Sequence, residues 1–244
     1  MARYSTVGEI INQAAVEIGL LPSTNPVESP EEASIQMVGL LNSAGLELLQ
    51  LHPWQMVIRP FEILTEEGDT GIYNLPDDFD YMIDQTGWDR KNRIAMAGPL
   101  SPQDWTYLEG RDLVSGTVYA SFRQWEGKLY LFPQPPPPDM RITFEYASRG
   151  WLQDAADPEN RRDRIGDNSD ICLLPGLVIT KFLKMKFLQA KGFDVSGAAL
   201  EFDNVLASAT GRDNGAPVLS ANRSGRGFPY LNANRNISDS GYGM

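Results

Sequence analysis

The chain has 244 residues, 42% of them hydrophobic and 22% charged, which allows a sizeable core in one or two domains. A single cysteine, Cys172, excludes an intramolecular disulfide, and the net charge of −11 argues against bulk attraction to nucleic acid or to an anionic membrane. Because the sequence has no run of about 18 apolar residues and no apolar signal stretch at its start, we expect a soluble protein made in a cytoplasm.

Two helices are predicted in residues 1–55. In "STVGEIINQAAVEIGLL", Thr6 and Glu9 form a capping box in front of an apolar stripe. In "SPEEASIQMVGLLNSAGLELLQL", Ser29 is expected at the N-cap and Pro30 at the first helical position. The main apolar stripe of this second helix comprises Met37, Leu40, Leu41, Ala44, Leu48 and Leu51.

The second helix also carries apolar residues off its main stripe, namely Ile35, Val38 and Leu49. An apolar arc of this width exceeds what a single partner helix needs. We therefore expect a second neighbour on this helix, and we take these three residues as candidates for an interface with another subunit.

Residues 56–150 change period and are expected to form an inserted antiparallel β-sandwich or barrel. The segments "TVYASFRQW" and "KLYLFP" are separated only by Glu126 and Gly127, and "RITFEYAS" alternates apolar and polar residues. Further strands are predicted at 59–64, 71–75, 80–88 and 93–96, and a short helix at 102–109.

The stretch "FPQPPPPD" joins the predicted strands in "KLYLFP" and "RITFEYAS" and is interpreted as a hairpin loop. Proline cannot donate to a strand ladder and favours extended polyproline geometry. PxxP spacing is also found in ligands of aromatic-lined grooves. The strands on both sides favour a stiff turn over a partner-binding motif.

The segment "YNLPDDFDYM" contains three aspartates within four positions: Asp77, Asp78 and Asp80. A calcium loop would need ligands at alternate positions, a glycine and a distal glutamate, which this segment lacks. A catalytic acid pair would need a partner that separates the two pKa values. We favour a turn, after which Phe79, Tyr81 and Ile83 re-enter a strand with alternate side chains buried.

A connecting charged loop is predicted at 151–173. Within it, "DPENRRDRIGDN" contains Arg161, Arg162 and Arg164, which could touch phosphate. Acidic residues interleave with these arginines, which favours a solvated loop or a salt-bridged surface between subunits over nucleic-acid binding.

A second pair of helices is predicted at 174–211. The first begins at Pro175 and stops at Gly192, after which Asp194 can cap the last helix. The first helix of this pair is expected to turn its apolar residues inward and its lysines outward, the lysines being Lys181, Lys184, Lys186 and Lys191.

Residues 212–244 differ from the rest of the chain in composition and charge. Four arginines against two aspartates give the segment a net charge of +2, so residues 1–211 carry −13. Few aliphatic residues and no periodicity predict that the segment does not fold alone. We expect an extended arm that orders against a neighbour, with a frayed terminus as the alternative. Its candidate anchors and charge partners are Arg223, Arg226, Phe228, Tyr230 and Leu231.

Residues with reactive side chains are few. His52 follows the second predicted helix, where the negative end of the helix favours a positive charge. Cys172 lies between two aliphatic residues, which is typical of a buried thiol. One cysteine and one histidine cannot form a zinc site, and no GxxxxGK[ST] or GxGxxG phosphate loop is present. We therefore expect no catalytic residue, no metal and no cofactor.

These features together resemble the head-to-tail adaptors of short-tailed bacteriophages, the tail tubular protein A family. The resemblance covers the whole chain and depends on "LHPWQMVIRPFEI", "YNLPDDFDYM", "LYLFPQPPPPDMRITFEYAS", the two helix pairs and the polar tail. It implies an α+β fold in which both chain ends form a four-helix bundle with an inserted β-domain and an extended C-terminal arm.

The resemblance also implies a structural protein of the virion neck, assembled in the host cytoplasm and acting without a membrane. Such adaptors form rings, typically of twelve subunits, between the portal protein and the tail nozzle protein. Double-stranded DNA passes through the ring without sequence-specific binding, and an acidic body would repel its phosphates. Residues 212–244 would be the arm that docks on the portal.

Two alternatives remain open at the level of the sequence. One is a different structural role in the virion, as a tail-completion protein or a host-surface-binding protein that uses the β-domain. The other is a virion-associated glycan hydrolase with an acid pair that includes Glu62 or Asp78.

Overall fold

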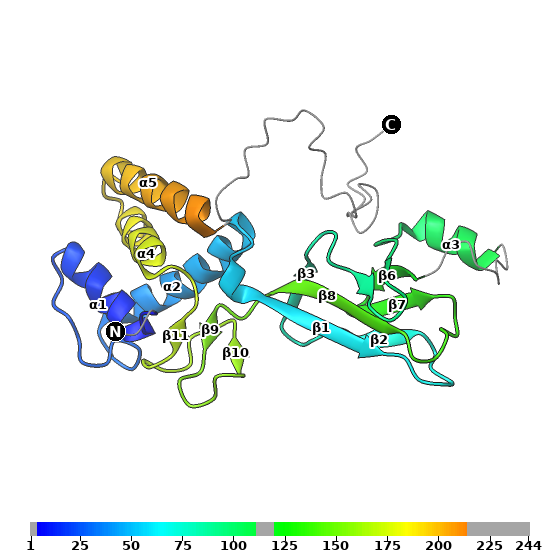
Figure 1. Cartoon of the computed structure of the whole chain (residues 1–244). Coiled ribbons are helices and arrows are strands. Elements are labelled where there is room, and N and C mark those ends of the chain that lie inside the picture. Colours follow the sequence, from blue (N-terminus) through cyan, green and yellow to red (C-terminus); the bar gives the residue numbers. More distant parts are fainter. Residues whose placement is uncertain (1–3, 111–119, 214–244) are drawn as a thin grey trace. The chain divides into compact units, whose positions relative to one another are not determined.

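A computed structural model describes residues 4–110 and 120–213, and it confirms the α+β class with antiparallel sheets (Figure 1). The chain divides into two compact units. Among the described residues, the first unit contains 4–58 and 148–213, and we call it the helical unit. The second contains the described part of 59–147, and we call it the β unit.

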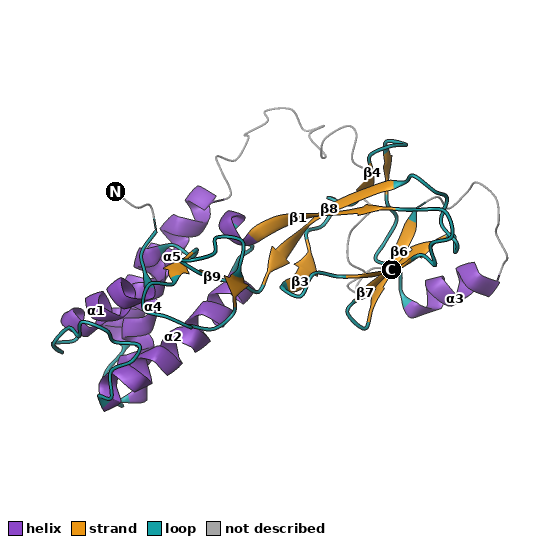
Figure 2. Ribbon diagram, turned by 90° about the horizontal axis from the view of Figure 1, so that it is seen from below, coloured by secondary structure: helices purple, strands orange, loops and turns teal. Residues whose placement is uncertain are grey.

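Four helices form the helical unit: α1 (Val7–Glu17), α2 (Glu32–Leu51), α4 (Gly176–Ala190) and α5 (Ser196–Asp213). Helix α4 contacts each of the other three, and α1 also contacts α2 (Figure 2). The capping box predicted for α1 is confirmed, since Glu9 N donates to Thr6 Oγ1 at 3.3 Å and Thr6 N donates to Glu9 Oε2 at 2.9 Å.

The predicted start of α2 is wrong by two residues. The N-cap is Glu31, and its side chain makes no capping hydrogen bond. Ser29 Oγ accepts a long hydrogen bond of 3.4 Å from Glu31 N, so this hydroxyl closes a local turn before the helix begins. At the other end of α2, Leu51 was expected on the buried stripe but is 58% exposed.

The predicted signals between α4 and α5 are confirmed. Lys191 is the C-cap of α4, and Gly192 follows with φ of +76°, a conformation that favours glycine. Asp194 Oδ1 then accepts a hydrogen bond of 3.0 Å from Ser196 N at the start of α5. Helix α5 continues to Asp213, so the helical segment extends two residues beyond the predicted boundary at 211.

The predicted loop at 151–173 instead contains a three-stranded antiparallel sheet with the order β10-β9-β11. Its strands are β9 (Leu152–Gln153), β10 (Arg161–Arg162) and β11 (Ile171–Cys172). Trp151 is fully buried with the helices, and its Nε1 donates to the carbonyl oxygen of Asp163 at 2.9 Å. A Cβ at Gly45 of α2 would lie 2.3 Å from the Trp151 indole, so glycine permits this close contact.

The β unit contains two antiparallel sheets and one helix. Its elements, preceded by a 3-10 turn η1 (Gln55–Val57), are β1 (Ile58–Leu64), β2 (Ile72–Asn74), β3 (Phe79–Met82), β4 (Trp88–Asp89), β5 (Ile94–Ala95), α3 (Pro102–Gly110), β6 (Ser121–Trp125), β7 (Lys128–Phe132) and β8 (Arg141–Ser148). One sheet has the order β1-β8-β4-β5 with β3 also paired to β8, and the other has the order β2-β7-β6. Both sheets contribute to one buried cluster that includes Ile63, Phe122, Leu131 and Phe144.

The predicted turn between β6 and β7 is confirmed, with Trp125 paired to Lys128 and positive φ at both Glu126 and Gly127. The predicted hairpin across "FPQPPPPD" is wrong, because β7 pairs with β6 and β2 whereas β8 belongs to the other sheet. A run of prolines offers no amide donors and favours extended backbone, so this segment carries the chain from one sheet to the other.

Candidate functional site

The aspartate cluster forms a turn, as predicted. Phe79 N donates to the Pro76 carbonyl oxygen at 2.9 Å, and Asp78 accepts hydrogen bonds from Arg59 Nη1 at 3.1 Å and Tyr146 OH at 2.8 Å. Within 4–110 and 120–213, no group of three or more His, Cys, Asp or Glu residues is placed to hold a metal ion. In this geometry Asp78 joins the turn to β1 and β8.

The predicted alternation after this turn is wrong at Tyr81, which is exposed, whereas Met82 is buried. Strand β3 has four residues and ends at Met82, so the alternation does not extend along the whole predicted strand. Phe79 does face inward, with its ring stacked on that of Tyr146 at a centroid distance of 5.5 Å.

Cys172 is fully buried, as predicted, and burial raises the pKa of its thiol to about 12. His52 has a longer-range role than predicted. It is the C-cap residue of α2, but its Nε2 lies 3.0 Å from Asp213 Oδ2, and the same carboxylate oxygen accepts 3.0 Å from Gln55 N. His52 therefore connects the end of α2 to the end of α5, a contact that no local sequence signal indicates.

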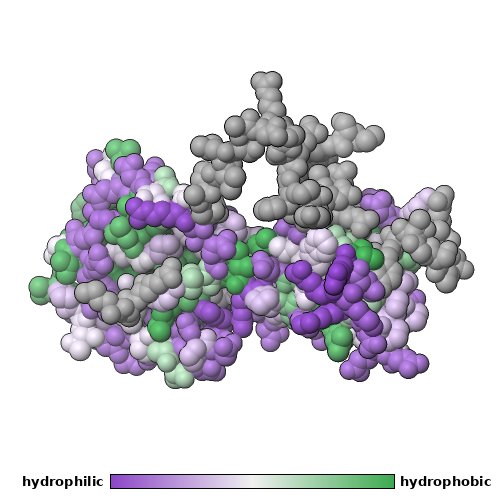
Figure 3. All heavy atoms as spheres, in the orientation of Figure 1, coloured by the Kyte–Doolittle hydropathy of each residue, from purple (hydrophilic) through white to green (hydrophobic). Residues whose placement is uncertain are grey.

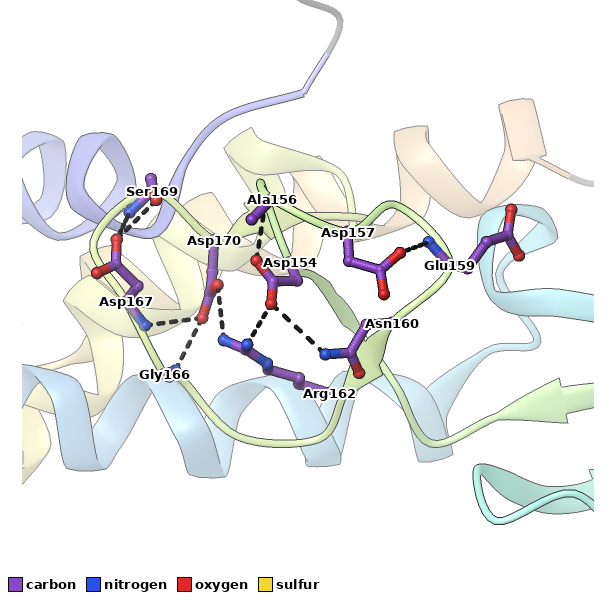
Figure 4. Close-up of polar contacts among 10 residues, drawn as sticks. All are labelled: Asp154, Ala156, Asp157, Glu159, Asn160, Arg162, Gly166, Asp167, Ser169 and Asp170. Carbon is purple, nitrogen blue, oxygen red and sulfur yellow. Dashed lines mark hydrogen bonds and ion pairs between the residues drawn. The ribbon is translucent and has the colours of Figure 1, made fainter.

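The charged loop is organised around Arg162 (Figure 4). This guanidinium forms ion pairs with Asp154 and, at 3.2 Å, with Asp170 Oδ1. Asp170 is fully buried, and its other oxygen accepts from Gly166 N at 2.8 Å and Asp167 N at 2.9 Å. Arg162 is thus engaged within the loop, whereas Arg164 is exposed. The candidate phosphate contact at Arg162 is therefore replaced by a structural role.

The lysines of α4, predicted to point outward, are largely covered by the neighbouring helices. Because α4 contacts α1, α2 and α5, its lysines form ion pairs with all three helices, and both Lys181 and Lys184 lie within 3.5 Å of Glu17 and Glu201. These pairs join Lys181 to Glu17 at 2.8 Å, Lys184 to Glu201 at 2.9 Å and Lys186 to Glu47 at 2.7 Å. Hydrogen bonding to Glu17 raises the pKa of Lys181, and hydrogen bonding to Lys184 lowers the pKa of Glu201.

The three candidate interface residues of α2 have different environments. Ile35 is 62% exposed, and Val38 is partly buried against the core. Leu49 is buried in the helical core, so its selection as an interface residue is corrected. Helix α2 is covered on more sides than its stripe suggested, since both α1 and α4 contact it.

Further exposed apolar residues in the helical unit were not predicted from the sequence. The large ones, in addition to Ile35, are Val16, Leu20, Leu21, Leu46, Leu51, Leu177, Phe193 and Leu200. Figure 3 shows hydrophobic residues at the surface among hydrophilic ones on the face in view. Helix α5 buries Ala198 and Phe202, and Leu200 lies off this face, which is the same signal that identified Ile35, so this criterion could have found it.

The β unit contains an aromatic pocket of about 160 Å³. Its lining residues are Trp105, Thr106, Glu109, Arg123, Trp125, Tyr130 and Gln134. Arg123 lies over the ring of Trp125 at 5.2 Å, and Trp105 Nε1 donates to Glu109 Oε1 at 2.7 Å. The pocket therefore combines aromatic faces with fixed charged groups of both signs, an arrangement that suits a small polar ligand.

No family model matches the chain, and no curated protein matches it. Within the part of the chain that the structure describes, no helix is both long enough and apolar enough to span a bilayer. The predicted docking-arm residues, Arg223, Arg226, Phe228, Tyr230 and Leu231, lie outside the described residues.

Proposed function

We propose that the chain is a structural protein of a virion, a head-to-tail adaptor whose copies form a ring between a portal protein and a tail nozzle protein. The observation that carries the proposal is the set of exposed apolar side chains on the helical unit, of which Leu21, Ile35 and Leu200 are each more than 60% exposed. Exposed apolar side chains mark a protein–protein contact where they form a large contiguous patch on a folded unit.

The exposed apolar residues occur on different elements of the helical unit: Val16 on α1, Ile35 on α2, Leu177 on α4 and Leu200 on α5. A subunit in a closed ring must contact a neighbour on each of two sides, so apolar residues on several elements fit that role. Full burial of each such side chain contributes about 1.5–3 kcal/mol, and a few residues per contact can hold a ring together. In this proposal α1, α2, α4 and α5 serve as a four-helix bundle, and the two sheets of the β unit serve as a sandwich.

The acidic composition of the chain suits a channel for DNA. Residues 4–58 contain six glutamates and no lysine or arginine. An acidic wall repels phosphates and lowers the friction of passing DNA. The test is DNA retention and ejection in particles after neutralisation of acids that line the channel, and unchanged ejection would count against this role.

Electron microscopy of the purified protein mixed with portal protein tests the central proposal. We expect rings that cap the portal. The double variant Ile35→Ser/Leu200→Ser should change the free energy of unfolding by less than about 1 kcal/mol, because both residues are exposed, yet it should abolish the rings. Tyr107→Ser in the β unit, at a residue that is 52% exposed, is the matched control and should leave the rings intact. Rings of normal abundance in the double variant would overturn the proposed interface.

A truncation that leaves α5 intact tests whether the C-terminal arm docks on the portal. The predicted boundary at 212 would remove Arg212 and Asp213, which belong to α5, and Asp213 contacts His52 and Gln55. Deletion of 214–244 should therefore leave the fold intact and abolish co-sedimentation with portal. Co-sedimentation of the truncated protein at wild-type stoichiometry would exclude the arm as the docking element.

A host-surface-binding protein is the second candidate, and the aromatic pocket of the β unit favours it. In that case Trp125→Ala should abolish binding of the purified protein to host cells. The adaptor function expects no change in portal capping by the same variant, so the two assays separate the candidates.

A further inference from the structure

A groove of about 330 Å³ lies in the helical unit between α1, the loop that follows it and the start of α2. Its lining includes the buried side chains of Ile11, Ala15 and Met37 and the exposed side chain of Leu21. Asn12 fixes the loop, since its Nδ2 donates to Ser23 O at 2.8 Å and its Oδ1 accepts from Ser23 N at 2.9 Å. The groove is therefore a built feature whose lining joins apolar side chains to the polar side chains of Asn12, Ser23, Glu31 and Ser34.

The electrostatic surroundings of the groove are acidic. Glu31 lines it, and Glu28 and Glu32 are close in sequence. The whole described segment 4–58 contributes no lysine or arginine. Lys191 lies 3.7 Å from Glu32, and Lys181 and Lys184 pair with Glu17 near the end of α1. An occupant of this groove is expected to be apolar at its centre and positively charged at its edge.

The segment 214–244 of the same chain has this composition. It contains three arginines and one aspartate, a net charge of +2, and the apolar residues Phe228, Tyr230 and Leu231 follow Arg226 closely.

The same segment also has the length to reach the groove. It begins after Asp213, whose carboxylate contacts His52 at the C-terminal end of α2, whereas the groove lies at the N-terminal end of α2. With 20 residues, α2 is about 30 Å long. The 15 residues from Asp213 to Phe228 span up to about 50 Å when extended, so the chain can follow the full length of α2 with slack.

We propose that residues 223–231 of the same chain occupy the groove in the free protein, with an aromatic side chain against Ile11, Ala15 and Met37 and an arginine beside Glu31. A tethered segment acts at an effective concentration in the millimolar range, so even a weak contact is populated. This inference goes beyond the proposed function: the groove holds the arm on its own subunit, and an external partner must compete for it.

The test uses cross-linking of the full chain. Native Cys172 is buried, so engineered thiols at the surface react selectively. The double variant Ala33→Cys/Leu231→Cys places one thiol in the groove and one in the segment. The control, Ala207→Cys/Leu231→Cys, places the first thiol at an exposed position of α5 instead. Because position 207 is nearer to 231 along the chain, an arm that does not dock would favour the control pair. We expect the groove pair to form an intramolecular disulfide about tenfold faster than the control.

Charge substitution sharpens this test. Glu31→Lys in the groove pair should reduce the cross-linking rate to that of the control, whereas Glu67→Lys at an exposed position of the β unit should leave it unchanged. A cross-linked dimer would mean that the segment of a second copy occupies the groove and would overturn the proposal. Equal rates for the groove and control pairs would also overturn it. Either failure leaves the portal experiments unaffected, since these use a different partner and readout.

Discussion

The helical unit and the β unit expose different kinds of apolar residue. Most of the large apolar residues at the surface of the helical unit are aliphatic, whereas those of the β unit include Tyr81, Tyr107 and Trp125. Aliphatic side chains gain free energy only by leaving water, so they suit a protein partner. Aromatic side chains beside Arg123 and Glu109 can also bind a polar ligand. The two units therefore differ in the chemistry of their exposed apolar surface.

The units also differ in which parts of the sequence form them. The described residues of the β unit, 59–110 and 120–147, fall within one stretch of the sequence, whereas the helical unit takes residues from both sides of that stretch. Contacts across the helical unit are therefore distant in sequence, as for Lys181 with Glu17 and His52 with Asp213. The helical unit is complete only after the last helix is made, and substitutions at these long-range contacts should affect it selectively.

Trp151→Ala is expected to give the largest effect in this comparison. Trp151 is fully buried against α2, and its Nε1 is hydrogen-bonded. Loss of a buried tryptophan removes apolar burial and leaves a cavity, which should lower the free energy of unfolding of the helical unit by about 3–5 kcal/mol. Urea denaturation of the full chain measures it. Trp125→Ala, at a half-exposed tryptophan of the β unit, is the matched control, and an equal loss in both variants would contradict the assignment of Trp151 to the helical core.

Arg162→Met is expected to have an intermediate effect. The substitution keeps much of the side-chain volume but leaves Asp170, which is buried, without its cationic partner. An uncompensated buried acceptor costs about 1–3 kcal/mol, and the two backbone amides that also bind Asp170 favour the lower part of that range. Arg164→Met, at the exposed arginine two positions later, should cost almost nothing in the same thermal or urea denaturation. If both variants lose the same stability, Arg162 does not organise the loop.

Features that depend on local sequence could be predicted. The capping box at Thr6, the stop at Gly192, the turn at Glu126 and Gly127 and the turn at Asp78 all depend on a few consecutive residues, and the structure contains each of them. Most strands of the β unit overlap the predicted segments, but the predicted strand at 80–88 is interrupted, since β3 ends at Met82 and β4 begins at Trp88. For these elements, the conformation that the local sequence favours is the conformation found in the folded chain.

Features that depend on distant partners could not be predicted. Nothing near His52 indicates Asp213, and nothing near Lys186 indicates Glu47, because each partner comes from the other end of the chain. Leu49 was assigned to an interface because helical periodicity defines a face without naming the element that covers it. The strands beside the proline run were assigned to one hairpin because adjacency in sequence is the default for antiparallel strands.

Cys172→Ala is expected to give the smallest effect. Cys172 lies in β11 of the three-stranded sheet and is buried in the helical core. Burial holds the thiol neutral and raises its pKa from the usual 9.0 to about 12. The raised pKa of the thiol stabilises the folded chain fully at pH values below the pKa of the thiol in the unfolded chain. This stabilisation is lost as the pH rises toward the pKa of the thiol in the folded chain. Between pH 7 and 9.5 the wild type should therefore lose about 0.8 kcal/mol more than Cys172→Ala in urea denaturation. Tyrosines with raised pKa values, such as Tyr73, titrate equally in both proteins and cancel in the difference. Parallel pH dependence of the two proteins would mean that the thiol ionises as readily in the folded chain as in the unfolded one.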